Sequence, residues 1–255
     1  MKVGYFPPFS KAMETCCPIV ELRQYTLFPG KREVLIDLFE REFIETQEAV
    51  GMKVIGQFRD LDDPNRFVWL RGFSSMASRE QALNGFYTGP AWRKHRETAN
   101  TTMVDSDNVL LLRPASPVSG FSFPDDRPAP GANEIHNGLV VATIYHLRSS
   151  AGDDFSDFFE HLVKPIITEN GASILASLVT ENSANTFPAL PVREGENVFV
   201  WFTRFADEAA HEEHLNALAS SWQQSGNLRD ELDRRLSRGP EVLRLSPTAR
   251  SLLHG

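Results

Sequence analysis

Cysteine is nearly absent from this chain, since Cys16 and Cys17 are the only two among 255 residues. Neighbouring cysteines form a disulfide only through a strained ring, so we expect two inert thiols and no structural disulfide. Two ligands at this spacing are too few for a metal site. The sequence therefore predicts a reducing compartment, with the cytoplasm as the default, and no bound metal.

Long apolar runs and an excess of positive charge are also missing. No segment approaches the roughly 20 apolar residues of a membrane span, and the N-terminus resembles neither a signal peptide nor a transit peptide. A net charge of −8 argues against nucleic acid as a partner. A hydrophobic content of 41% with 24% charged residues is typical of a globular protein with a real core.

The chain does contain an internal repeat. Tyr25-x-Leu27 returns 120 residues later as Tyr145-x-Leu147, and Phe67-Val68-Trp69 returns 132 residues later as Phe199-Val200-Trp201. An offset that stays constant and changes once indicates a duplicated unit with one insertion. We therefore expect a tandem duplication of two domains, each about a hundred residues long.

Each copy has the pattern strand, helix, strand, strand, helix, strand, which is the ferredoxin-like unit. Ser75 and its equivalent Asp207 are expected to cap the second helix of each copy. A four-stranded sheet with both helices on one face leaves the other face bare. We therefore predict an α+β fold in which two ferredoxin-like (βαββαβ) units pack sheet to sheet as an intramolecular α+β barrel.

The predicted domain organisation has five parts. They are an N-terminal extension (1–18), a first domain (19–114), a proline-rich linker (115–137), a second domain (138–248) and a C-terminal tail (249–255). Homodimerisation of the whole chain stays open, with no surface assigned to it.

Strand alternation divides the strand residues into two faces. We assign Glu21, Arg23, Tyr25, Trp69 and Arg71 to the face that looks into the space between the two sheets, which is the natural place for a ligand. In the second copy we assign Tyr145 and Trp201 to that space. Alternation in the second strand of the first copy is compatible with either Gln57 or its neighbours on this face.

Two interpretations of these charges are open. Glu21 and an arginine can form an internal ion pair with a purely structural role. Alternatively, the two guanidinium groups of Arg23 and Arg71 bind a planar or aromatic anion beside Tyr25 and the tryptophans. Of the two arginines, Glu21 can neutralise only one, so the second interpretation predicts a net positive spot.

Three other features are weaker candidates. His95 shares a helix face with Trp92 and can act as an acid or a base. Packing in the core or at its rim is the preferred explanation, because no second catalytic group is identifiable beside it. His211 and His214 lack metal-site spacing and are expected on a solvated helix face. The insertion at 182–196 is either a lid over a site or tolerated slack in a surface loop.

Several short motifs of the first copy resemble the NIPSNAP family in the family's order. They lie between residues 19 and 114 and include Glu21-Leu22-Arg23-Gln24-Tyr25, Gly56-Gln57-Phe58-Arg59-Asp60, Arg66-Phe67-Val68-Trp69-Leu70-Arg71-Gly72-Phe73 and Asp107-Asn108-Val109 up to Pro114. The second copy resembles a diverged unit that lacks both arginines. The resemblance implies the dimeric α+β barrel superfamily, which includes cofactor-free monooxygenases, haem enzymes and small-molecule isomerases.

The family has no agreed biochemical activity, and its animal members are described as mitochondrial adaptor proteins, so the resemblance leaves function open. Two hypotheses follow. In the first, the protein binds a small anionic or aromatic metabolite between its repeats, without a cofactor, and is either a binding protein or a monooxygenase- or isomerase-like enzyme. In the second, it is a non-catalytic adaptor. No nucleophile, metal set or glycine-rich loop identifies a reaction.

Overall fold

The computed structural model, which describes residues 15–123, 127–134, 136–149 and 153–254, contains the predicted element order twice. The first run consists of β1 (Ile19–Leu27), α1 (Arg32–Leu38), η1 (Phe39–Phe43), α2 (Ile44–Glu48), β2 (Lys53–Asp60), β3 (Arg66–Phe73), α3 (Met76–Tyr87), α4 (Pro90–Asn100) and β4 (Met103–Pro114). The second consists of β5 (Leu139–His146), α5 (Asp153–Phe158), η2 (Phe159–Val163), α6 (Lys164–Glu169), β6 (Ser173–Thr180), β7 (Val198–Phe205), α7 (Glu208–Gln224), α8 (Leu228–Arg235) and β8 (Glu241–Pro247). Both predicted caps are confirmed, because Ser75 Oγ accepts from the Ser78 amide and Asp207 Oδ1 from the Ala210 amide.

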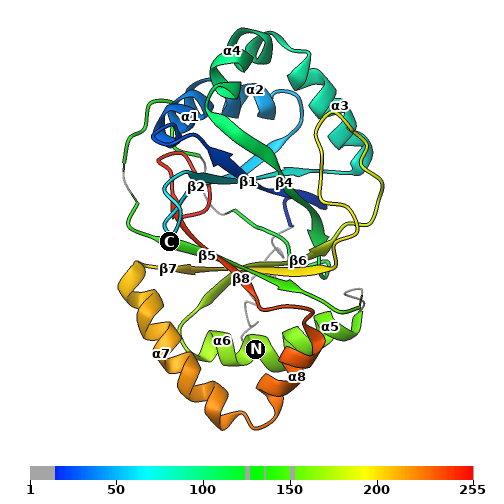
Figure 1. The fold of residues 1–255 in the computed structure, drawn as a ribbon, viewed down its shortest axis with the longest axis vertical. Helices are drawn as coiled ribbons and strands as arrows, with labels where there is room; N and C mark the ends of the chain where they lie inside the picture. The colour runs from blue at the N-terminus through cyan, green and yellow to red at the C-terminus, as the bar shows by residue number, and fades with distance from the viewer. Residues whose placement is uncertain (1–14, 124–126, 135, 150–152, 255) are drawn as a thin grey trace, which may run out of the picture.

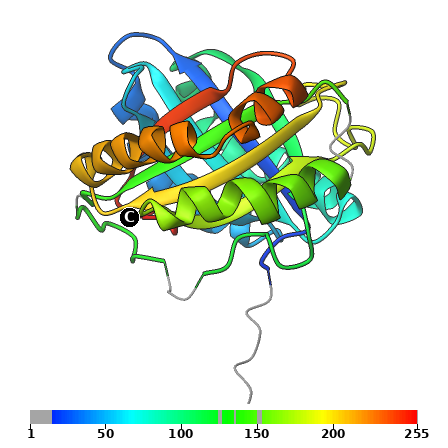
Figure 2. The same cartoon turned by 90° about the horizontal axis from the view of Figure 1, so that it is seen from below.

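The eight strands form one closed barrel in the order β1-β3-β2-β8-β5-β7-β6-β4 (Figure 1). The four strands of each run are neighbours, and the pairs β2–β8 and β4–β6 join the two runs. The predicted packing of two sheets is therefore realised as a single sheet without free edges. Helices of the first run lie at one end of the molecule and those of the second at the other (Figure 1). In Figure 2, which is seen from below, the helices of the second run lie in front of the strands.

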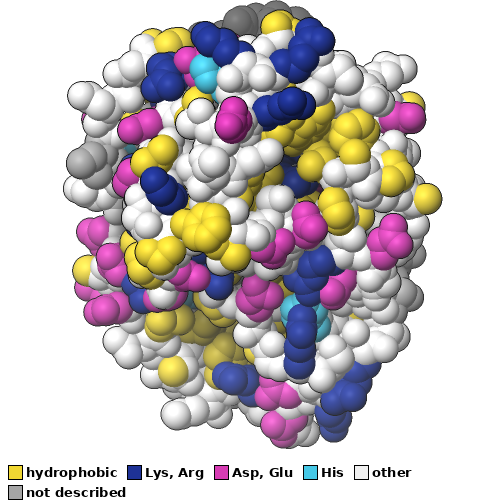
Figure 3. Space-filling view, turned by 45° about the horizontal axis from the view of Figure 1, so that its top comes forward, with side chains coloured by type: hydrophobic (Ala, Val, Ile, Leu, Met, Phe, Trp, Pro, Cys, Tyr) yellow, Lys and Arg dark blue, Asp and Glu magenta, His cyan; other side chains and the backbone are white. Residues whose placement is uncertain are grey.

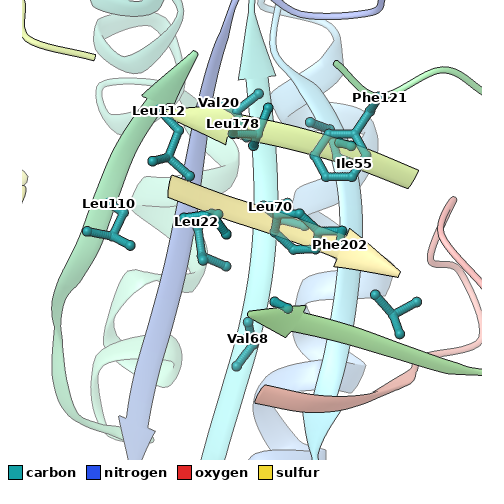
Figure 4. Close-up of a cluster of buried hydrophobic side chains, with 14 of the residues drawn as sticks. Val20, Leu22, Ile55, Val68, Leu70, Leu110, Leu112, Phe121, Leu178 and Phe202 are labelled. Carbon is teal, nitrogen blue, oxygen red and sulfur yellow. The ribbon is translucent and has the colours of Figure 1, made fainter. Parts of the chain in front are cut away.

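The space between the two halves of the barrel is filled by apolar side chains (Figure 4). Val20, Leu22, Val68 and Leu70 point into it from the first run and Phe202 from the second. This contradicts the assignment made from strand alternation, which placed the other face of these strands, with Glu21, Trp69 and Arg71, in this space. Alternation separates two faces but does not say which one meets the helices, and here both faces are buried.

The opposite faces of the strands pack under the helices in two separate clusters. Trp69 lies in the cluster of the first run and Trp201 in that of the second. Tyr25 and Tyr145 accompany them in the same way. The prediction that Trp69 and Trp201 both face the space between the sheets is wrong, because each ring lies under the helices of its own run.

Two further features bear on the predictions. Cys16 and Cys17 form a disulfide, contrary to the expectation of free thiols, and one argument for a reducing compartment is lost with it. Among the described residues, no helix has the length and apolarity needed to cross a membrane. Residues 1–14 of the predicted N-terminal extension lie outside the described residues.

The C-terminal segment after β8 packs against the first run. Thr248 Oγ1 donates to Glu40 Oε1 over 2.6 Å, and the buried Arg250 Nη1 donates to the Glu40 carbonyl oxygen over 2.6 Å. Leu252 and Leu253 are buried as well. The segment predicted as a tail is therefore part of the folded body.

Candidate functional site

A charged cluster is buried between the sheet of the first repeat and helix α3. Glu21 Oε2 accepts from Arg23 Nη1 over 2.6 Å and from Arg71 Nε over 2.8 Å, while Glu21 Oε1 accepts from Arg79 Nε over 2.6 Å. All four side chains are essentially inaccessible to solvent. Three guanidinium groups thus share one carboxylate, and the predicted net positive spot is present with one arginine more than expected.

Local structure explains how these side chains meet. Glu21 and Arg71 are direct partners across β1 and β3, as are Arg23 and Trp69, which confirms that the first and third strands are neighbours. Directly opposite residues of antiparallel strands project on the same face of the sheet. Arg79 follows the Ser75 cap by one helical turn and belongs to the buried stripe of α3 with Ala82, Leu83 and Phe86. The helix therefore presents Arg79 to Glu21.

Electrostatics keeps the carboxylate of Glu21 ionised. Burial alone would raise its pKa, but the positive charges of Arg71, Arg23 and Arg79 outweigh burial and hold the pKa of Glu21 well below its usual range. Burial raises the pKa of Tyr25, so its hydroxyl, which accepts from Arg23 Nε over 3.0 Å, is neutral at pH 7. Within the described part of the chain, no second carboxylate is hydrogen-bonded to the three arginines.

Several buried polar atoms of this cluster have no hydrogen-bond partner in the described residues. They are Arg71 Nη2, Arg79 Nη2, Trp69 Nε1 and both amide atoms of Gln57. Gln57 is the cross-strand partner of Trp69, so its amide lies in the same layer. Buried donors without partners are rare and costly in folded proteins. Their concentration beside a net positive charge is suited to binding an anion.

An aromatic cavity adjoins the arginines. It measures about 30 Å³ and is lined by Tyr25, Leu35, Phe39, Phe43, Gln47, Trp69, Phe86, Tyr87, Trp92, Ala99 and Met103. The guanidinium carbon of Arg71 lies 5.1 Å from the Trp69 ring centre and that of Arg23 lies 5.6 Å from it. Cation–π contacts of this kind orient the arginines against the cavity wall. Hydrophobic side chains gather in the upper part of the face shown in Figure 3.

The structure brings together five of the predicted site residues: Glu21, Arg23, Tyr25, Trp69 and Arg71. The prediction placed them between the repeats, whereas the structure places them under the helices of the first repeat. Tyr145 and Trp201 do not join them, because they belong to the cluster under the helices of the second repeat. Burial raises the pKa of Tyr145 to about 12.

His95 lies near this site without lining the cavity. Its Nε2 is 3.3 Å from Glu42 Oε2, and its ring stands edge-on to Phe43 at 6.3 Å between centres. His211 and His214 are buried against Phe205, so the expectation of a solvated face is wrong. No group of three metal-ligating side chains occurs in the described ranges.

Sequence reasoning missed Arg79 and Gln47. Arg71 Nη1 contacts Gln47 Oε1 at 3.4 Å, which links the cluster to α2. The available signal for Arg79 was its position in the apolar stripe of α3, where an arginine is out of place unless it has a buried partner.

The same layer of the second repeat has no such charges. The equivalent positions lie 120 or 132 residues later. There the second repeat has Val141 for Glu21, Thr143 for Arg23, Ile167 for Gln47, Ser177 for Gln57, Thr203 for Arg71 and His211 for Arg79. The aromatic positions are kept, with Tyr145, Phe159, Phe199 and Trp201 matching Tyr25, Phe39, Phe67 and Trp69. The fold therefore forms with or without the polar cluster.

Comparison of the whole chain with solved structures finds the same fold in distant proteins. A candidate monooxygenase of Fusobacterium nucleatum subsp. nucleatum is 12% identical, with a TM-score of 0.56 over 94% of this chain and 96% of that one. A candidate monooxygenase of Lactobacillus acidophilus is 15% identical, with a TM-score of 0.52 over 91% and 94%. An anthrone oxidase-like protein is 12% identical, with a TM-score of 0.54 over 93% and 95%. At these identities the likeness concerns the fold alone.

Sequence comparison is more specific for the first repeat. No curated protein matches the chain. The NIPSNAP family model matches residues 20–117, a range that contains β1 to β4 except for Ile19, together with the arginine cluster of the sheet and α3. The first repeat is therefore similar to the NIPSNAP family over residues 20–117.

Proposed function

We propose that this protein binds a small aromatic molecule with one carboxylate group, in the first repeat, between the sheet and helices α2 to α4. The observation that carries the proposal is the contrast between the repeats. All six polar side chains of the cluster are replaced in the second repeat, while the aromatic frame is kept. A structural need of the fold would apply to both repeats, so the charges serve something that only the first repeat does.

The chemistry of the cluster supports an anion as the ligand. Arg71 and Arg79 each have one free Nη2 group, and guanidinium groups bind carboxylates through charge-assisted hydrogen bonds. A bound anion would also reduce the excess positive charge around Glu21. The walls formed by Tyr25, Phe39 and Trp69 suit an aromatic ring, since aromatic side chains favour offset or edge-to-face contacts.

We further propose that the two runs of elements are ferredoxin-like units, with a first domain at 19–114, a linker at 115–137 and a second domain at 138–248. The orders β4-β1-β3-β2 and β8-β5-β7-β6 within the barrel support this division. The adaptor hypothesis is retained as the alternative outcome of the experiment below. The names of the distant neighbours, at 12–15% identity, do not assign a reaction.

The test is calorimetric titration with benzoate and with its neutral analogue benzamide. We expect benzoate to bind and benzamide to bind far more weakly, because the site would leave buried guanidinium groups unpaired with a neutral ligand. Arg71→Thr, which copies the second repeat, should abolish benzoate binding.

The repeat supplies a matched control. Trp69→Phe should weaken benzoate binding, whereas Trp201→Phe, the same change at the equivalent buried position, should leave it unaltered. If wild type and Arg71→Thr behave alike toward benzoate and related aromatic acids, the binding proposal is wrong and the adaptor hypothesis takes its place.

A further inference from the structure

The loop between β6 and β7 lies on the first repeat although it belongs to the second. Arg79 Nη1 donates to Asn185 Oδ1 over 3.0 Å and to Thr186 Oγ1 over 3.2 Å. Thr186 Oγ1 also donates to the Met76 carbonyl oxygen over 3.3 Å. In Figure 1 this loop is the yellow segment beside α3. The second repeat thus contacts the arginine cluster directly.

The tip of the loop packs against an aromatic side chain at the edge of the cavity. The Phe187 ring stacks on Tyr87 with ring centres 5.8 Å apart and an angle of 25° between planes. Tyr87 in turn contacts Trp92 at 4.9 Å between centres, and both line the cavity. Tyr87 and Trp92, together with Met103, are the half-buried members of the lining, so the ring of Phe187 packs on part of the edge where the cavity meets solvent.

Both ends of the loop are fixed, whereas its tip is held by side chains. The amides of Glu181 and Arg193 donate to the carbonyl oxygens of Leu111 and Val109, each over 2.9 Å, so β4 anchors the loop on either side of its tip. The tip keeps its own shape, because Asn185 Nδ2 donates to the Leu190 carbonyl oxygen over 3.0 Å. A preformed tip between two fixed ends can move as one piece.

The size of the cavity requires such a movement. About 30 Å³ holds one or two water molecules, whereas small-molecule sites usually measure several hundred Å³. The ring of an aromatic acid does not fit a cavity of this size, so side chains at its edge, among them the stacked Tyr87 and Phe187, must move to admit one.

We propose that residues 182–196 are a lid, supplied by the second repeat, that opens to admit the ligand of the first repeat and closes over it. Phe187 is the cover, and Arg79 is the latch. Arg79 lies between Glu21 and the lid oxygens, and its free Nη2 is left for the anion. The role of the lid depends on the proposed function of the ligand site. That site is complete only when the second repeat supplies its cover.

The first experiment needs no ligand. Acrylamide quenching of tryptophan fluorescence is measured in a Trp222→Phe background, which removes the half-exposed tryptophan of α7. Phe187→Ala should raise quenching, because the path to Trp92 and Trp69 is uncovered. Replacing 182–196 by Asp62-Asp63-Pro64-Asn65, the turn at the equivalent place in the first repeat, should raise it further. Glu194→Gln, an exposed position of the same loop, is the control and should change nothing.

The second experiment measures the association and dissociation rates of benzoate by stopped flow. Phe187→Ala should raise both rates by about three- to tenfold, as expected from the loss of one aromatic pair, with a smaller change in Kd. Unchanged quenching in both loop variants overturns the lid. Raised quenching without benzoate binding to wild type keeps the lid and rejects the proposed ligand, so the two failures are distinguishable.

Discussion

Glu21 is the residue on which the buried cluster depends, since it is the shared acceptor of Arg23, Arg71 and Arg79. A buried charge that loses its partner is far more costly than one that never existed, because desolvation is no longer compensated. The three arginines can therefore remain buried only while Glu21 is ionised. The charges of these arginines hold the pKa of Glu21 well below its usual range and so keep it ionised at pH 7.

We predict that Glu21→Val lowers the free energy of unfolding by about 3–5 kcal/mol, the usual cost of leaving buried charges unpaired. The combined variant Glu21→Val, Arg23→Thr, Arg71→Thr and Arg79→His copies the second repeat and should be more stable than Glu21→Val alone. Urea unfolding of both variants measures the difference between their free energies of unfolding. A combined variant that is the less stable of the two would show that the charges hold the fold together, against the binding proposal.

At the scale of elements, the sequence predicted what short-range rules determine. Helical and strand periodicity predicted the order of elements, and cross-strand adjacency brought Arg23 and Arg71 together. The side of the sheet was predicted wrongly, because β1 and β3 are buried on both faces, so burial does not distinguish the face under the helices from the face toward the barrel interior. The interior takes apolar side chains such as Val20 and Leu22, whereas the layer under the helices supplies Arg71 with polar partners, Glu21 and Gln47.

Arg79 and Phe187 escaped prediction for a different reason. Their roles depend on how α3 docks on the sheet and on where the loop of the other repeat falls, and neither follows from periodicity. The loop at 182–196 could be identified as an insertion from the change of repeat offset. Its position over the first repeat could not.

The corrected strand faces lead to a prediction about the barrel interior. Phe202 is fully buried there, with its ring edge-on to Phe121 at 5.1 Å between centres. Phe202→Ala should cost about 3–5 kcal/mol in thermal or urea unfolding and leave benzoate binding unchanged. Phe28→Ala, at a half-exposed site, serves as the control and should have little effect. Loss of benzoate binding in a folded Phe202→Ala protein would indicate that the ligand binds in the space between the sheets.

At the scale of the whole molecule, the two repeats are joined at several places. They share the core inside the barrel, close the sheet through β2–β8 and β4–β6, and complete the candidate site through the loop of the second repeat. The segment after β8 adds a further connection. The chain crosses from the second repeat back to α2 of the first, where Arg250 meets Glu45 and the carbonyl oxygens of Glu40 and Pro128.

We predict that Arg250→Ala destabilises the whole barrel, because it removes a buried guanidinium that satisfies two backbone carbonyl oxygens. Leaving buried acceptors unpaired costs about 1–3 kcal/mol each. Arg244→Ala is the matched control: Arg244 pairs with the exposed Asp62 and Glu208, and exposed pairs contribute about 0–1 kcal/mol. Urea unfolding followed by fluorescence and by circular dichroism should give one coincident transition, shifted only in Arg250→Ala. Two separated transitions in that variant would mean that the repeats fold independently and that the segment merely lies on the surface of the first.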